Sequence, residues 1–466
     1  MDRLCKAAAA AVVLVHFFAL AGDGLRSGFM PDDMMNLYGY WTKPAWRLTA
    51  DLLNPFSAAY RPAGALFYTP LFAFFGLEPQ PFRTVCFVLL VANLGLAFLL
   101  IRRLSNSFAA AILGALLFSY QAHLSDLYYS AAAIYDLLAA FFYYGCLLRY
   151  IQARQRDHRI GWGRCAVLCA LFWLALNSKE IAITLPAVLL AREITGAGCL
   201  PCESHLRARL AAGWRCLACM TVLGVVYLTP RLSGPAPMTS NPAYHPLWSA
   251  QTYLDNLSHY LSLLLYRPQQ LSAAATMVLC AAALAAALLV RSRILTFAWL
   301  LFMLGSLPVM FIPARGAFVT YVPALGLAMY LAVPAAKAAQ TLSRTTRNVP
   351  TAERATAPAG LAALAALAVL LYSVHRAHNP LAAGWVAREE GKLRQVFEAA
   401  SQLRTRLQPG ARVLLQGDPF AEDDWAPVLA LRLYYRDPDL HVDRVADPSP
   451  LPQATAGAYD AVFVIR

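Results

Sequence analysis

The sequence predicts an α-helical membrane protein that crosses the bilayer many times and ends in a small α/β unit. Hydrophobic residues make up 59% of the 466 residues and charged residues only 14%, a balance that water-soluble globular chains seldom reach. Apolar runs near the ~20 residues that a bilayer requires recur as far as residue 376. Beyond that point, helix and strand patterns of mixed polarity replace them.

About eleven crossings are expected, with the amino terminus in the cytoplasm and the carboxyl terminus outside. The first apolar run follows Arg3 and Lys6, and we interpret it as an uncleaved anchor rather than a signal peptide. The expected spans are Ala7–Ala21, Pro81–Ile101, Ser107–Ala122, Ala131–Leu148, two limbs of a hairpin within Cys165–Ala191, Trp214–Pro230, Leu271–Val290, Ile294–Pro313, Ala317–Pro334 and Leu361–His375.

The hairpin is inferred from charge. Basic loops flank an apolar stretch that Lys179 and Glu180 interrupt, and both loops stay in the cytoplasm only if the stretch turns back. Its charged tip must then lie in a cavity lined by protein. A single crossing is the alternative, and it reverses the side of every later loop. The net charge of +13 reports this orientation, because it is scattered over loops and does not form the basic face that nucleic acid requires.

We therefore expect a polytopic domain over residues 1–376, with a functional first outer loop at 22–80, and an extracytoplasmic α/β domain over 377–466. The second domain is expected to contain helices at Glu389–Arg406 and Trp425–Arg436 and strands at Ala411–Gln416 and Ala461–Ile465. Glu422, Asp423 and Asp424 are interpreted as the solvated amino terminus of a helix, where carboxylates suit the helix dipole, rather than as metal ligands.

Four cysteines have a spacing close to that of a tetrahedral zinc site. They are Cys199, Cys202, Cys216 and Cys219. The alternative, which the apolar run after Cys219 favours, is that they serve as small apolar residues.

Three acidic residues are candidates for catalysis at the outer surface. Asp32 and Asp33 lie just beyond the first span, where a carboxylate can act as a base or as a metal ligand. Asp126 lies in the short loop after the third span. A helix-capping role is the alternative for all three.

Three cations are expected near the same surface. Lys179 at membrane depth needs an anionic partner, and that partner is either a bound phosphate or the adjacent Glu180. Arg61 and Arg315 each lie close to a proline in an outer loop and can hold phosphate oxygens through two donors. Arg61 can alternatively extend its guanidinium to the membrane interface.

Several motifs follow one another in order between Asp32 and Pro323. They are Ala59-Tyr60-Arg61-Pro62, Phe75-Gly76-Leu77-Glu78-Pro79, Asp126 with Asp136, Ser178-Lys179-Glu180, Thr184-Leu185-Pro186, Asn241-Pro242, Tyr260 and Arg267-Pro268. This set resembles the transmembrane and tetratricopeptide-repeat O-mannosyltransferases and their bacterial relatives. The chain differs from that family in lacking the repeats, in having Asp126 where the family has Glu, and in the displaced position of His123.

The resemblance implies a GT-C fold and an enzyme that moves a sugar, with inversion, from a polyprenyl-phosphate carrier to a glycan, lipid or protein acceptor. It implies that Asp32 or Asp33 is the first catalytic acid, that Asp126 is the second, and that Arg61, Lys179 and Arg315 bind the donor phosphate. Glu180, His123 and Tyr60 support them. A divalent metal bound by Asp32 and Asp33 stays open. We expect a multi-pass protein of the bacterial inner membrane that contacts membrane lipids. The alternative is a lipid-linked glycan transporter or assembly factor without catalysis.

Overall fold

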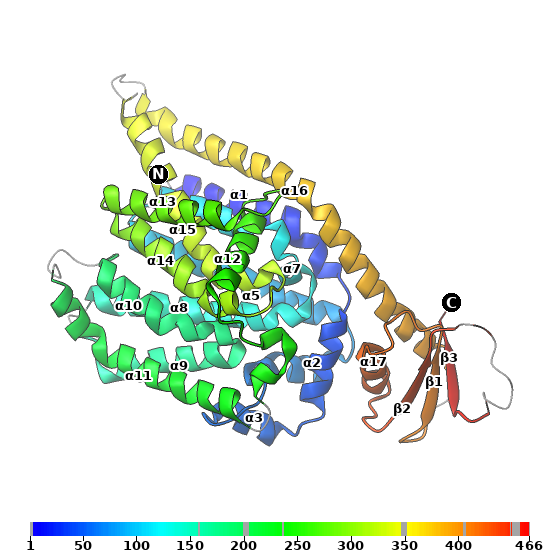
Figure 1. The fold of residues 1–466 in the computed structure, drawn as a ribbon. Helices are drawn as coiled ribbons and strands as arrows, with labels where there is room; N and C mark the ends of the chain where they lie inside the picture. The colour runs from blue at the N-terminus through cyan, green and yellow to red at the C-terminus, as the bar shows by residue number, and fades with distance from the viewer. Residues whose placement is uncertain are drawn as a thin grey trace.

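The computed structural model describes residues 3–156, 159–198, 205–234, 237–345, 352–403, 407–447, 449 and 457–465. Helices dominate these residues and pack into one bundle, beside which a small sheet lies at the carboxyl end (Figure 1). The α-helices are α1 (Arg3–Ala21), α2 (Pro31–Trp41), α3 (Ala45–Leu53), α4 (Ala65–Phe75), α5 (Pro79–Ser105), α6 (Phe108–Ser119), α7 (Asp126–Tyr129), α8 (Ile134–Arg156), α9 (Trp162–Ser178), α10 (Leu185–Thr195), α11 (Leu206–Ser233), α12 (Ala250–Leu264), α13 (Ala273–Leu289), α14 (Arg293–Ser306), α15 (Tyr321–Thr345), α16 (Ala352–Ser401) and α17 (Ala426–Tyr435).

Seven helical segments among the described residues are long and apolar enough to cross a membrane. They are Arg3–Arg26, Pro79–Ser105, Ala131–Arg156, Leu206–Ser233, Arg293–Phe311, Ala317–Thr341 and Pro358–Asn379. Shorter apolar helices cover three further predicted spans, at Phe108–Ser119, Trp162–Ser178 and Ala273–Leu289. The prediction of a polytopic helical membrane protein is confirmed by these lengths. The count of eleven crossings and the side of each loop stay predictions.

Helix α8 lies within the bundle. In the segment Ala131–Arg156, which contains it, 72% of the most apolar stretch is buried by other parts of the chain. Tyrosines carry much of this packing. Tyr143, Tyr144 and Tyr150 are fully buried, and the Tyr144 hydroxyl donates to the carbonyls of Tyr321 at 3.1 Å and Val322 at 3.0 Å. A buried hydroxyl is costly unless it is hydrogen-bonded, so these bonds fix α8 against the start of α15.

Helix α16 is continuous over 50 residues, which corresponds to about 75 Å at the rise of an α-helix. It packs along α1 and reaches α17 at its far end (Figure 1). The sequence predicted two separate helices here, a last span ending at His375 and a charged helix beginning at Glu389. That separation is wrong, because helical backbone continues between them and across the expected domain boundary at residue 376.

Three parallel strands form the sheet in the order β2-β1-β3, where β1 is Arg412–Gln416, β2 is His441–Val445 and β3 is Ala461–Val464. In the register, Val413 pairs with Val442 on one side and with Ala461 on the other. Strand β1 is central, and from its second residue onward it is buried on both faces, which explains its apolar sequence. The strands expected at β1 and β3 and the helix expected at α17 are present.

Helix α17 packs against α2, and this contact places the sheet unit beside the first loop. The Tyr38 hydroxyl of α2 donates to the carbonyl of Pro438 at 3.4 Å and accepts from Arg432 at 3.4 Å. The guanidinium of Arg436 lies 5.4 Å from the ring centre of Phe72 in α4. Residues of the last 40 positions therefore help to hold the loop that carries Asp32.

Candidate functional site

Asp33 caps helix α2. The backbone N–H of Met30 donates to its carboxylate at 2.8 Å, and the side chain is fully buried. Burial raises the pKa of Asp33 to about 7, against the lowering effects of the Met30 hydrogen bond and of Arg83. This is the capping role that the sequence left open, and it leaves Asp33 without access to a substrate.

Asp32, one residue earlier in the first turn of α2, stays exposed. The surrounding protein nevertheless removes enough water to raise its pKa. The nearby Arg315 cation opposes this rise, the Asp424 carboxylate adds to it, and Arg61 opposes it. Asp32 is therefore accessible and lies within electrostatic range of two predicted phosphate-binding arginines.

Asp126 begins α7 and lies within electrostatic range of Asp32. Burial raises its pKa to about 6, with further rises from Asp136 and Asp32 and a lowering by Lys179. A Cβ atom added to Gly316 would lie 3.1 Å from one Asp126 oxygen. The carboxylate of Asp126 therefore lies against the backbone next to Arg315.

Arg61 forms a two-pronged ion pair with Glu180, at 3.3 Å from Nε to Oε1 and 2.9 Å from Nη2 to Oε2. Its Nη2 also donates to the Tyr244 hydroxyl at 3.0 Å, and its guanidinium lies 4.5 Å from the ring centre of Tyr60. The backbone of Arg61 is left-handed, with φ of 44°, and its carbonyl accepts from Tyr40 at 2.8 Å. Such a conformation is costly for a residue with a side chain, so the hydrogen bonds around Arg61 must hold it.

Lys179 pairs with Asp136, not with its neighbour Glu180. Its ammonium lies 2.5 Å from Asp136 Oδ1 and 4.8 Å from the ring centre of Phe318. Both partners of the pair are buried. Of the two partners that the sequence left open for Lys179, Glu180 is therefore excluded. Extended backbone at Lys179, between α9 and the 3-10 turn η5 (Glu180–Thr184), points the two neighbouring side chains to different partners.

Arg315 differs from Arg61 and Lys179 in its partners, which are a hydroxyl and an aromatic ring. Its backbone N–H donates to the Tyr260 hydroxyl at 3.0 Å, and its guanidinium lies 4.7 Å from the ring centre of Tyr244. Among the residues that the structure describes, no carboxylate lies within ion-pairing distance of this guanidinium. Stacking on an aromatic ring orients a guanidinium and leaves its N–H groups free to donate.

His123 lies among other rings, with its ring centre 5.3 Å from that of Tyr266 and 5.9 Å from that of His378. Sequence reasoning missed Tyr244 and the approach of Asp424 to Asp32. The nearest signal for Tyr244 was the Asn241-Pro242 motif, three residues earlier. Asp424 accepts the N–H of Ala426 at 2.8 Å at the start of α17, which agrees with the helix-terminus interpretation.

Metal ligation is limited in the described part of the chain. No group of three or more His, Cys, Asp or Glu side chains there has the spacing of a metal site. Cys216 and Cys219 lie within α11, with Cys216 buried and Cys219 half-buried. Cys199 and Cys202 lie outside the described residues, so the zinc hypothesis stays untested.

The fold and the span lengths define a polytopic helical membrane protein with a charged site beside the amino end of α8. No protein-family model and no curated protein matches the sequence. Among solved structures, the crystal structure of ArnT from Cupriavidus metallidurans bound to undecaprenyl phosphate is similar at 16% identity over 93% of this chain and 85% of that chain, with a TM-score of 0.47. Similarity at this level establishes neither a shared family nor a shared activity, and the sequence resemblance stays a prediction.

Proposed function

We propose that this chain is a membrane glycosyltransferase that moves a sugar from a polyprenyl-phosphate carrier to an acceptor hydroxyl, at the outer face of the membrane and with inversion. The observation that carries the proposal is that the exposed Asp32 and the half-buried Asp126, both with a raised pKa, lie near Arg315. Arg315 stacks on Tyr244 and has no ion-pair partner among the described residues. A base near neutral pH and a cation for a leaving phosphate are the two groups that this reaction needs.

Asp32, Asp126 and Arg315 account for every bond and proton that changes in this reaction. The acceptor oxygen forms a bond to the anomeric carbon, while the bond from that carbon to the phosphate oxygen breaks and its electron pair leaves with the phosphate. Asp32 or Asp126 takes the acceptor proton, and Arg315 donates hydrogen bonds to the phosphate as its charge grows. Because its pKa is raised, such a carboxylate is, once deprotonated, a stronger base than an ordinary aspartate.

The two ion pairs have a positioning role in this proposal. Arg61, Lys179 and Asp136 are buried and Glu180 is half-buried. Each ion pair places a cation near Asp32 and Asp126 while adding no net charge. Tyr60 and Tyr244 extend the Arg61 pair towards Arg315, because the two hydroxyls lie 3.4 Å apart and Arg315 stacks on Tyr244.

The test is a panel of polyprenyl-phosphate sugars incubated with the purified chain, with release of polyprenyl phosphate measured by mass spectrometry. Release is expected for at least one sugar. Asp51→Asn is a matched control, because Asp51 is also a first-loop acid but bonds to Ser57 at 3.1 Å and lies 4.0 Å from Lys43. Asp32→Asn should lose release while Asp51→Asn keeps it. Binding of donors without release of polyprenyl phosphate from any of them would contradict the proposal.

A further inference from the structure

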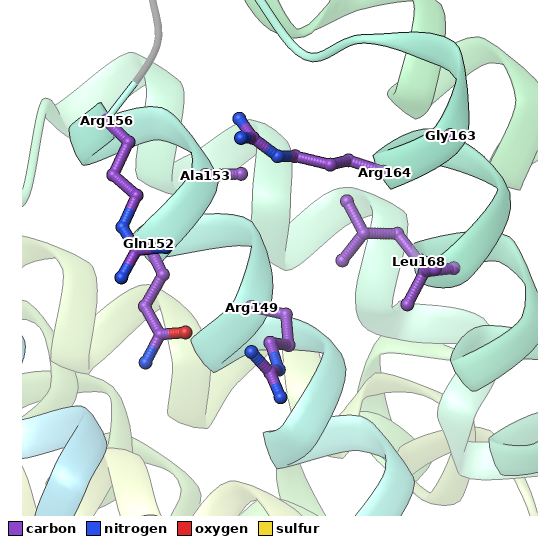
Figure 2. Close-up of a pocket in the computed structure, with 8 residues that line it drawn as sticks. Arg149, Gln152, Ala153, Arg156, Gly163, Arg164 and Leu168 are labelled. Atoms are coloured by element: carbon purple, nitrogen blue, oxygen red, sulfur yellow. The ribbon is translucent and has the colours of Figure 1, made fainter.

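A basic cavity of about 330 Å³ opens between the ends of α8 and α9 (Figure 2). Arg149 and Arg156 line it from α8, and the side chain of Arg164 reaches across from α9 towards them. Among the residues that the structure describes, none of those lining the cavity is acidic. Three guanidinium groups around one space repel one another, so this space favours an anion.

Two of the three arginines of the cavity have no ion-pair partner among the described residues. Arg149 and Arg156 are exposed, and within the described ranges neither lies in an ion pair. Gly163, which also lines the cavity, is in the first turn of α9, a turn without an acidic residue. Its N–H is one of the unpaired donors that open a helix and adds to the preference for an anion. Guanidinium groups bind phosphate oxygens through two donors, which makes a phosphate the best match.

The surroundings of the cavity favour a lipid phosphate. Ala153 and Leu168 form an apolar floor, and Val167, one turn deeper than Arg164, is 56% exposed. Trp162 and Trp214 lie at the same end of α9 and α11, exposed at 64% and 57%. Exposed tryptophans mark the membrane interface, where a headgroup meets the arginines and an acyl chain meets Val167.

The cavity lies at the opposite end of α8 from the candidate site. Asp136 is near the start of this helix and Gln152, which lines the cavity, is near its end, a separation of about 24 Å along the axis. Helix α9 repeats the pattern, with Arg164 at its start and Lys179 just beyond its end. The two sites are thus nearly a membrane thickness apart, and the cavity faces the side on which the basic loops are predicted.

We propose that the cavity between α8 and α9 binds the phosphate headgroup of an anionic phospholipid, in the leaflet opposite to the candidate catalytic site. The proposal does not depend on the glycosyltransferase activity. It predicts that the intact chain selects anionic lipids at this position and that the selection depends on the three arginines together with the open space between them.

The experiment measures lipid retention by native mass spectrometry of the full chain in detergent, with phosphatidylglycerol, cardiolipin or phosphatidylcholine added. The chain should retain the two anionic lipids and not phosphatidylcholine. In the triple variant Arg149→Gln, Arg156→Gln and Arg164→Gln, affinity for the anionic lipids should fall roughly a hundredfold, at about fivefold for each basic residue near an anionic headgroup.

Two further variants separate the cavity from general surface charge. The triple variant Arg103→Gln, Arg291→Gln and Arg293→Gln removes the same charge from exposed arginines on the same predicted side, outside the cavity. It should retain the anionic lipids. Gly163→Leu places an apolar side chain at the cavity wall without changing charge, and an added Cβ meets no atom within 4 Å there, so the backbone can accept it; a melting curve checks that the variant is folded. This variant should lose the anionic lipids.

Three results would overturn the proposal. One is equal retention by the wild type and the first triple variant, and another is an equal loss in both triple variants. The third is unchanged retention in Gly163→Leu. Inorganic phosphate and glycerol phosphate serve as competitors, and displacement of the lipid by either at micromolar concentration would show that the cavity takes a free phosphate and contradict the lipid assignment.

Discussion

The two adjacent acids of the first loop, Asp32 and Asp33, have different environments. This difference indicates which of them can react with a substrate. Asp32 is exposed, whereas Asp33 is buried and accepts from Met30. The sequence shows two adjacent acids ahead of a helix, and either fits a cap or a catalytic role. Only the direction of each side chain separates them, and adjacent helical residues point about 100° apart. The sequence therefore predicted the pair and left the assignment open.

Replacing each acid alone tests this division. Asp32→Asn should lower transfer by at least about a hundredfold, the usual contribution of a general base. Asp33→Asn should keep transfer, because the amide oxygen still accepts from Met30 and the cost of a buried charge disappears. Initial rates and melting temperatures of both variants provide the measurement. Equal loss of activity in the two variants, with both folded, would contradict the division.

The pKa of Asp126 gives the reaction a pH dependence. Burial raises this pKa from 3.8 to about 6, so protonation removes the carboxylate as pH falls through about 6. Transfer should fall over that range. Stability should change in the opposite sense, since a carboxyl whose pKa rises on folding stabilises the fold most below its unfolded pKa and loses this contribution as pH rises through the folded value.

Comparison with Asp126→Asn isolates the effect. The variant should melt higher than the wild type above pH 6, and the gap should close at lower pH. Rates from pH 5 to 8 and melting curves from pH 4 to 8 measure both trends. A wild-type rate that stays flat across this range would remove Asp126 from the proton transfer.

At the level of elements, helices with strong apolar runs were predictable and their partners were not. The 3-10 turn η5 begins at Glu180, where the sequence placed the hairpin tip. Lys179, the residue just before this turn, bonds to Asp136, which is 43 positions earlier on α8. No spacing rule reveals such a contact. Strand β2 was missed because His441–Val445 carries Asp443 and Arg444, so it lacks the apolar run that marked β1.

The ion pair between Lys179, which precedes η5, and Asp136 of α8 can be tested by removing one partner. Lys179→Met leaves Asp136 buried without its cation, which should cost roughly 3 to 5 kcal/mol of stability. The double variant Lys179→Met with Asp136→Leu should recover most of the loss, because it leaves no stranded charge. Thermal unfolding of the single and double variants is the measurement. A double variant as unstable as the single one would contradict a direct pair.

At the scale of the whole molecule, composition was enough to predict a polytopic helical membrane protein. It was not enough to predict how the carboxyl end packs, because α16 continues through the expected boundary and brings α17 onto α2. The contacts of Tyr38 with Pro438 and Arg432 join positions about 400 apart in the chain. Helix α16 is continuous here although Pro380 and Gly384, two residues of low helix propensity, follow the boundary, so propensity and apolar pattern both suggested a break.

Orientation follows from the predicted topology and needs no substrate. A reporter that is active only outside the cytoplasm should be active when fused after Arg466 and silent when fused after Arg156. A fusion at Asn241 should be active for a hairpin at Lys179 and silent for a single crossing. The opposite pattern at Arg466 and Arg156 would invert the topology and move the candidate site to the cytoplasmic face.

The most direct test of the glycosyltransferase proposal follows the phosphorus of the donor. A polyprenyl-phosphate sugar is a phosphodiester, and transfer of its sugar leaves a phosphomonoester. Phosphorus NMR of proteoliposomes containing the chain, a suitable donor and an acceptor should therefore show the monoester appearing at the rate of sugar transfer, and Asp32→Asn should abolish it. A donor that changes leaflets as an intact diester, at the same rate in both proteins, would contradict catalysis and identify a transporter.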